Sequence, residues 1–137
     1  MIKGPQRWAW KRRKLRKLAD EAFEKEAMAV YSKATMEDVQ TLKNWDELEK
    51  GSLRYERDVL NGIAATGSPF AHSSFERPSN AYEKEKRLRQ IEKELALAEE
   101  KLKGRDKQIE MLRKEAEILW NSAVELWNRR KVFKERF

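Results

Sequence analysis

The sequence contains no cysteine and only one histidine, His72. Without cysteine, disulfides and thiolate metal sites are excluded, and the chain is compatible with a reducing compartment. No run approaches the roughly 18 consecutive apolar residues that a membrane-spanning helix needs. Charged residues make up 40% and hydrophobic residues 39% of the 137 positions, so we do not expect a large globular core. The 9% of aromatic residues argues equally against simple disorder.

The sequence also lacks the patterns that catalysis requires. His72 lies in a segment rich in Gly, Ser and Pro, and a triad with Ser73 or Ser74 would need a nucleophile elbow that this segment does not offer. There is no phosphate-binding loop, paired-histidine metal motif or calcium loop. We therefore expect no enzyme, no cofactor, no metal site and no small-molecule substrate.

Acidic residues are absent from residues 1–18, which carry eight positive charges. Residues 129–137 carry five positive charges and one negative charge. Because the whole chain has a net charge of +7, the residues between these ends have a net charge of −5. Two basic ends on a mildly acidic body indicate anionic partners at the termini.

The C-terminal part has a heptad pattern that predicts one long, coiled-coil-like helix over about residues 80–137. Asn80 and Glu83 form a capping box before it. Lys84, Arg105 and Arg130 interrupt the apolar seam, and Gly104 leaves a helical hairpin as the rival interpretation. The unbroken heptad phase across Gly104 favours a continuous helix. The apolar residues at the a and d positions are Ala81, Leu88, Ile91, Leu95, Ala98, Leu102, Ile109, Leu112, Ala116, Leu119, Ala123, Leu126, Phe133 and Phe137.

The N-terminal part, residues 1–61, is predicted to form shorter helices. The first begins at Gly4 and Pro5 and runs to about residue 34. Thr35 is expected to cap a second helix that ends near Gly51, and Ser52 a third that ends at residues 61–62. The apolar residues expected to pack are Trp8, Leu15, Leu18, Ala19, Ala22, Phe23, Ala29 and Val30 in the first helix, and Val39, Leu42, Trp45 and Leu48 in the second.

Residues 62–79 are predicted to be an irregular linker or arm in which Phe70 and Phe75 anchor the chain to a surface. The expected fold is thus all-α and elongated, with one long C-terminal helix partly packed by shorter N-terminal helices. It has three parts: a basic helical region (1–61), a linker (62–79) and a long heptad helix (80–137).

The heptad seam predicts an interface for partner helices. Its g and e charges are mixed, since Arg87 and Glu92 would attract in a parallel homodimer whereas Glu94 and Glu99 would repel. We expect the stretch from Leu88 to Leu112 to be left for an external protein. The residues predicted to form this interface are Leu88, Ile91, Leu95, Leu102, Ile109, Leu112, Leu119, Trp120, Leu126 and Trp127.

The basic termini predict a site for a polyanion. Cations mixed with indoles are typical of RNA binding, and RNA is favoured over an anionic lipid surface because the cations surround the predicted helix. In the C-terminal turn, stabilisation of the helix dipole explains the cations equally well. The predicted anion-binding residues are Arg7, Trp8, Trp10, Lys11, Arg12, Arg13, Lys14, Arg16, Lys17, Arg129, Arg130 and Lys131.

These features favour a non-catalytic structural or accessory subunit of a ribonucleoprotein, of ribosomal or organellar ribosomal type. The alternatives are a peripheral accessory subunit of a membrane-bound complex and a self-associating coiled-coil adaptor. The basic N-terminal helix also resembles a mitochondrial targeting sequence, although it lacks Ser and Thr. The expected location is an intracellular reducing compartment, either the mitochondrial matrix or the cytoplasm.

Overall fold

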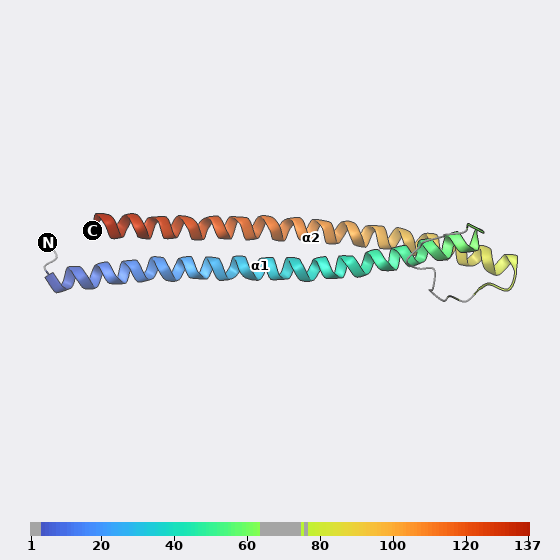
Figure 1. Ribbon diagram of the computed structural model, residues 1–137, viewed down its shortest axis with the longest axis horizontal. Coiled ribbons are helices and arrows are strands. Elements are labelled where there is room, and N and C mark those ends of the chain that lie inside the picture. Colours follow the sequence, from blue (N-terminus) through green and yellow to red (C-terminus); the bar gives the residue numbers. More distant parts are fainter. Residues whose placement is uncertain (1–3, 64–74, 76) are drawn as a thin grey trace. The chain divides into compact units, whose positions relative to one another are not determined.

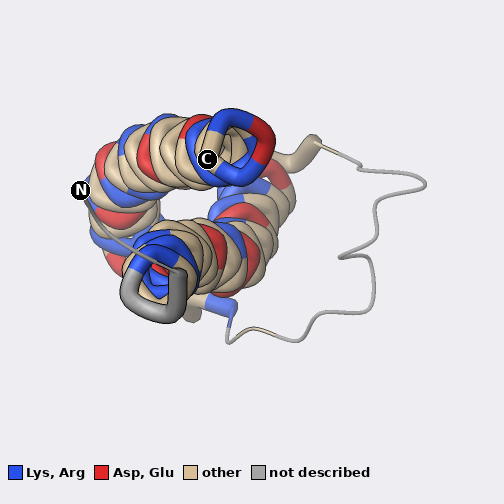
Figure 2. The backbone as a smooth tube through the Cα atoms, turned by 90° about the vertical axis from the view of Figure 1, so that its left-hand side faces the viewer, with Lys and Arg blue, Asp and Glu red and all other residues tan. Residues whose placement is uncertain are grey.

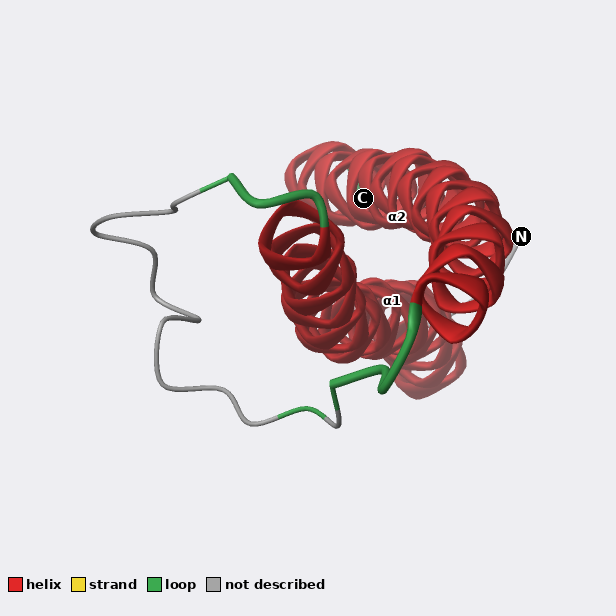
Figure 3. Ribbon diagram, turned by 90° about the vertical axis from the view of Figure 1, so that its right-hand side faces the viewer, coloured by secondary structure: helices red, strands yellow, loops and turns green. Residues whose placement is uncertain are grey.

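The computed structural model describes residues 4–63, 75 and 77–137, and it contains two helices, α1 (Gly4–Leu60) and α2 (Ala81–Arg136) (Figure 1). These described residues contain no strand (Figure 3). The all-α fold and the long C-terminal helix are therefore confirmed, and α2 continues through Gly104. Most of the predicted linker, including Phe70, His72, Ser73 and Ser74, lies outside the described residues.

Specific hydrogen bonds define the end of α1 and the start of α2, which we call the inner helix ends. The backbone N–H of Glu83 donates to Oδ1 of Asn80 over 2.8 Å, which confirms Asn80 as the N-cap of α2. At the end of α1, Gly62 has a φ of 75°, and its N–H donates to the carbonyl of Val59 over 3.0 Å. The N–H of Ile63 donates to the carbonyl of Asp58 over 2.8 Å. These two bonds form a Schellman motif, which satisfies carbonyl groups that the helix itself leaves unpaired.

The prediction of several short N-terminal helices is wrong, because α1 is one helix of 57 residues. The hydroxyl of Thr35 donates to the carbonyl of Tyr31 over 2.9 Å instead of capping a new helix. Gly51 and Ser52 lie within the helix. An interior glycine costs only about 1 kcal/mol relative to alanine, which a continuous packing surface can offset. That surface is the heptad seam of α1, formed by Leu15, Leu18, Ala22, Lys25, Ala29, Ser32, Met36, Val39, Lys43, Asp46, Lys50, Leu53, Arg57 and Leu60.

The chain forms two units, and the first contains Met1–Glu37 and Ile109–Phe137. In this unit 1, α1 and α2 run antiparallel and bury mainly small residues. Small side chains let two helix backbones approach closely, and the larger Trp127 packs at the border of the seam. Its indole N–H donates to the Glu26 carboxylate over 2.7 Å, and its ring meets Phe23 edge-on at 4.9 Å. The buried apolar residues of unit 1 are Leu18, Ala22, Ala29, Ile109, Ala116 and Ala123.

Unit 2 contains Asp38–Gln108 and has a more apolar core near the inner helix ends. Leu60, Ile91 and Leu95 form a buried cluster, and Ile91 is fully buried. Phe75 packs against this cluster and meets the ring of Tyr55 at 6.4 Å. The predicted anchoring role of Phe75 is therefore confirmed, and the surface it contacts belongs to its own chain.

A charged layer replaces the apolar seam in the middle of unit 2. The Asp46 carboxylate is paired with Lys101 and Arg105, each at 3.2 Å, and Lys43 is paired with Asp106 at 2.7 Å. Burial by itself raises the pKa of Asp46, but the hydrogen bonds and positive charges of Arg105 and Lys101 outweigh it and lower that pKa. The hydrogen bond to Asp106, opposed by desolvation, raises the pKa of Lys43.

This charged layer explains a second difference from the predicted packing. Val39 is buried as expected, but Leu42, Trp45 and Leu48 are exposed. The face of α1 that meets α2 carries Lys43, Asp46 and Lys50 in their place. In this part of α1, the apolar residues Leu42, Trp45 and Leu48 therefore mark the outer face of the helix and not the face that packs against α2.

Candidate nucleic-acid interface

The structure brings the two basic segments together at one end of unit 1. The guanidinium Nε of Arg130 donates to the carbonyl of Leu15 over 3.3 Å. The Trp10 ring lies 5.5 Å from Phe133 and 6.3 Å from Phe137, edge-on in both cases. The last turns of α2 therefore lie beside the first turns of α1. We call residues 7–17 and 129–136 the basic end. In the end-on view of Figure 2, lysine and arginine predominate in these turns.

The basic end contains twelve cations and one carboxylate, Glu135. Arg12, Arg13, Lys14, Arg16 and Lys17 are all exposed. Among the described residues, none of the seven cations between residues 7 and 17 forms an ion pair. A cluster of uncompensated positive charge at a surface attracts polyanions and speeds their encounter.

The cations on α2 are partly engaged with the protein. Arg129 is paired with Glu125 at 2.7 Å. The guanidinium of Arg130 lies 5.9 Å from the Trp127 ring centroid, in addition to its bond to α1. Lys131 is exposed and has no partner among the described residues. Arg130 therefore has a structural role, whereas Lys131 can contact a ligand directly.

The two indoles of the basic end have different surroundings. Trp8 is 62% exposed, and Nζ of Lys11 lies 5.7 Å from its ring centroid. Trp10 is 41% exposed and packs against Phe133 and Phe137. Trp8 thus offers an open ring with a cation beside it, the combination on which an unpaired base can stack. Trp10 mainly holds the two helix ends together.

Unit 2 provides a contrast, because its charges are largely paired. Lys50 and Arg54 both approach Glu99, at 3.3 Å and 3.9 Å. Arg87 forms a bidentate pair with Glu56, in which both hydrogen bonds are 2.7 Å long. Eight of the fourteen described cations of unit 2 are therefore paired with carboxylates, whereas none of the seven described cations between residues 7 and 17 is.

The residues predicted as a partner-helix interface pack mostly against α1 of the same chain. Ile91, Leu95 and Ile109 are buried. The prediction that the stretch from Leu88 to Leu112 is left for an external protein is therefore wrong. The long N-terminal helix covers the seam that several short helices could not have covered. Leu88, Leu102, Leu112, Leu119, Leu126 and Trp127 are half-buried, and Trp120 is 52% exposed.

Sequence reasoning missed the carboxylates that complete the seam. Arg105 stood out as a cation at a d position, but its partner Asp46 was not recognised. The missing signal was the heptad seam of α1, which places Asp46 at a d position as well. Aligning the two seams antiparallel would have matched these opposite charges.

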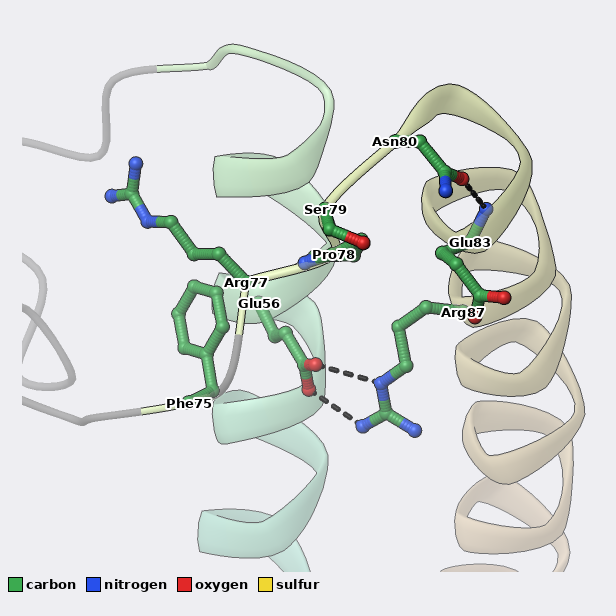
Figure 4. Close-up of a pocket in the computed structure, with 8 residues that line it drawn as sticks. All are labelled: Glu56, Phe75, Arg77, Pro78, Ser79, Asn80, Glu83 and Arg87. Atoms are coloured by element: carbon green, nitrogen blue, oxygen red, sulfur yellow. Dashed lines mark hydrogen bonds and ion pairs between the residues drawn. The ribbon is translucent and has the colours of Figure 1, made fainter.

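A pocket of about 650 Å³ lies between the end of α1 and the start of α2, where Phe75 and residues 77–80 line it (Figure 4). Its central groups are already paired, because Glu56 holds Arg87 and Asn80 caps α2. In Figure 4 the Arg77 side chain points away from this pair. No group of three metal-ligating side chains occurs among the described residues. The arrangement therefore offers charge pairing and helix capping.

Neither α1 nor α2, over their described residues, contains a stretch apolar enough to cross a membrane. Comparisons with protein-family models, with curated proteins and with solved structures find no match to this chain.

Proposed function

We propose that this chain is a non-catalytic structural subunit of a ribonucleoprotein, which binds RNA through its basic end. One observation carries the proposal: the cations of both termini converge on one end of unit 1, where the seven between residues 7 and 17 form no ion pair among the described residues, whereas eight of the fourteen described cations of unit 2 do. Uncompensated cations bind phosphates and release counterions, which supplies most of the affinity for nucleic acid.

A further feature supports RNA as the polyanion. The exposed ring of Trp8 lies beside Lys11 at the tip of unit 1 and can stack on an unpaired base. Phosphate contacts would then position the protein, and stacking would favour single-stranded or looped RNA.

The test is fluorescence anisotropy with a labelled RNA hairpin, measured between 50 and 300 mM salt. The variant R12Q/R13Q/K14Q/K17Q removes four exposed cations, and K84Q/K86Q/K93Q/K103Q removes four exposed cations of unit 2. The logarithm of the binding constant falls linearly with that of the salt concentration, with a slope of roughly 0.7–0.9 per phosphate contact. We expect the first variant to bind more weakly and to lose up to about 3 from this slope, and the second to resemble the wild type.

A Trp8→Ala variant separates stacking from charge. It should weaken binding to a looped RNA by about tenfold while leaving the salt slope unchanged. If R12Q/R13Q/K14Q/K17Q and K84Q/K86Q/K93Q/K103Q lost equal amounts of RNA affinity, the assignment of RNA binding to the basic end would be overturned. Binding to anionic phosphatidylserine vesicles, without measurable affinity for RNA, would instead identify the chain as a peripheral subunit at a membrane surface.

A further inference from the structure

One side of unit 1 carries an apolar surface that neither helix covers. We call it the Trp face, and its residues are Phe23, Val30, Trp120, Val124 and Trp127. The first four are 58%, 61%, 52% and 44% exposed, and Trp127 is half-buried. Beside Trp120 the surface deepens into a groove of about 480 Å³, which Ala29, Met36 and Ala116 of the seam also line. The Trp face is therefore continuous with the packing between α1 and α2, and it can accept further helices.

Two rows of side chains along this face carry charges in a self-complementary pattern. On α2, Glu117, Val124 and Lys131 are spaced by seven residues, so they lie in one row along the helix. On α1, Arg16, Phe23, Val30 and Glu37 form a corresponding row. Each row has an apolar middle and opposite charges at its two ends. A second copy of the same row, turned end for end, therefore places each charge opposite its complement.

The midpoints of the two rows lie at the same level along unit 1, so one two-fold rotation can relate both rows to those of a second copy. The middle of the α2 row is Val124, and the middle of the α1 row lies between Phe23 and Val30, at residues 26 and 27. The Glu26 carboxylate accepts a hydrogen bond of 2.7 Å from the Trp127 indole, and Phe23 contacts the same ring. The two midpoints thus lie side by side across unit 1. A single two-fold axis perpendicular to the helices can serve both rows at once.

We propose that the Trp face binds a second copy of this chain, so that two units 1 form an antiparallel four-helix bundle. Lys131 of each copy then faces Glu117 of the other, and Arg16 faces Glu37. Such an interface is isologous, as expected for a closed dimer. The same rotation brings Arg113 towards Lys134 of the other copy, and the ion pair of Arg113 with Glu110 at 3.2 Å offsets that repulsion.

This pairing leaves most cations of the basic end available to RNA. It uses Arg16 and Lys131 from the basic end and leaves Arg12, Arg13, Lys14 and Lys17 exposed. The end-for-end arrangement also keeps the two basic ends apart, which limits repulsion between them. A dimer would therefore present two separate anion-binding ends.

The test is sedimentation equilibrium of the nuclease-treated full-length chain over a range of concentrations. We expect a reversible dimer of the wild type. K131E and E117K should each weaken dimerisation at least about tenfold, because every like-charge contact occurs twice in the dimer. The double variant E117K/K131E should recover it, because the charges are exchanged and not removed. A mixture of the two single variants should form a heterodimer.

Cross-linking tests the position of the axis. The natural chain has no cysteine, so V124C introduces a single thiol close to the proposed two-fold axis. A short bismaleimide should link two V124C chains efficiently. I118C, at a residue that is 65% exposed and outside the Trp face, should link poorly. A monomer at all concentrations, a dimer insensitive to both charge reversals, or equal cross-linking at the two positions would overturn the proposal.

Discussion

The guanidinium of Arg87 donates two hydrogen bonds to the carboxylate of Glu56, and both are 2.7 Å long. The two residues lie 31 positions apart and join the end of α1 to the start of α2. Glu56 is buried, and the hydrogen bond that Arg87 donates to its carboxylate, opposed by desolvation, raises the pKa of Arg87. This bidentate contact fixes the geometry in which the apolar cluster of unit 2 packs.

Removing one partner of this pair should destabilise unit 2 more than removing both. Arg87→Met leaves the buried Glu56 carboxylate unpaired and should cost about 1–3 kcal/mol, since Arg87 itself is partly exposed. Glu56→Leu combined with Arg87→Leu should recover most of the loss. Urea unfolding followed by circular dichroism measures both. Equal destabilisation by the single and double changes would contradict this expectation.

Asp46 should make the stability of unit 2 depend on acid. Its folded pKa lies below the ordinary value of 3.8, so its contribution is fully present above that pH. The contribution is lost as the pH falls from 3.8 through the lowered folded pKa. The acid-induced fall in melting temperature between pH 5 and pH 2 should therefore be smaller in Asp46→Asn than in the wild type. Asp38→Asn, at an exposed residue of α1, is the control, and its fall in melting temperature over this pH range should match that of the wild type.

The fully buried Ile91 should be the most sensitive apolar position of unit 2. Ile91→Ala should cost about 2–4 kcal/mol, because it removes buried methyl groups and leaves a cavity. Leu97→Ala, on the same helix but 66% exposed, should change stability by less than about 0.5 kcal/mol. Chemical unfolding of the two variants side by side gives the comparison. Similar losses at both positions would show that Ile91 does not belong to a packed core.

Gly62→Ala should destabilise the end of α1 by about 1–2 kcal/mol. A Cβ at this position meets no atom within 4 Å, so the cost comes from the φ of 75° alone. Gly104→Ala provides the opposite case, because Gly104 is helical and its added Cβ also meets nothing within 4 Å. That change should stabilise α2 by up to about 1 kcal/mol. Thermal unfolding of the pair should show shifts of opposite sign.

The heptad periodicity was sufficient to predict α2 and its continuity across Gly104, and the spacing of Asn80 and Glu83 predicted its cap. The periodicity of α1 was harder to recognise, because Lys43, Asp46 and Lys50 occupy the positions where apolar residues were sought. Their contribution depends on Asp106, Lys101 and Glu99, which lie on the other helix. Pairing between distant segments is invisible to a search for local apolar stripes.

The candidate site was predictable in its residues but not in its geometry. Runs of cations at both termini were evident from composition. Their meeting at one end depends on the antiparallel packing of α1 and α2 in unit 1, shown by the contact of Trp10 with Phe133. Trp10 could not be distinguished from Trp8 by sequence, since only its distance from the α2 aromatics reveals its structural role.

The charged layer around Asp46 has a consequence for how the chain reaches its fold. Twenty residues separate α1 from α2, and a connection of that length does little to select one alignment of the helices. Sliding α2 by one heptad would place Ala98 opposite Asp46 and leave a carboxylate without a cation. Apolar heptads alone would accept such a slip at modest cost, whereas a charge at the centre of the seam opposes it. The ion pair of Asp46 with Arg105 thus favours one register of α2 against α1 and destabilises shifted ones.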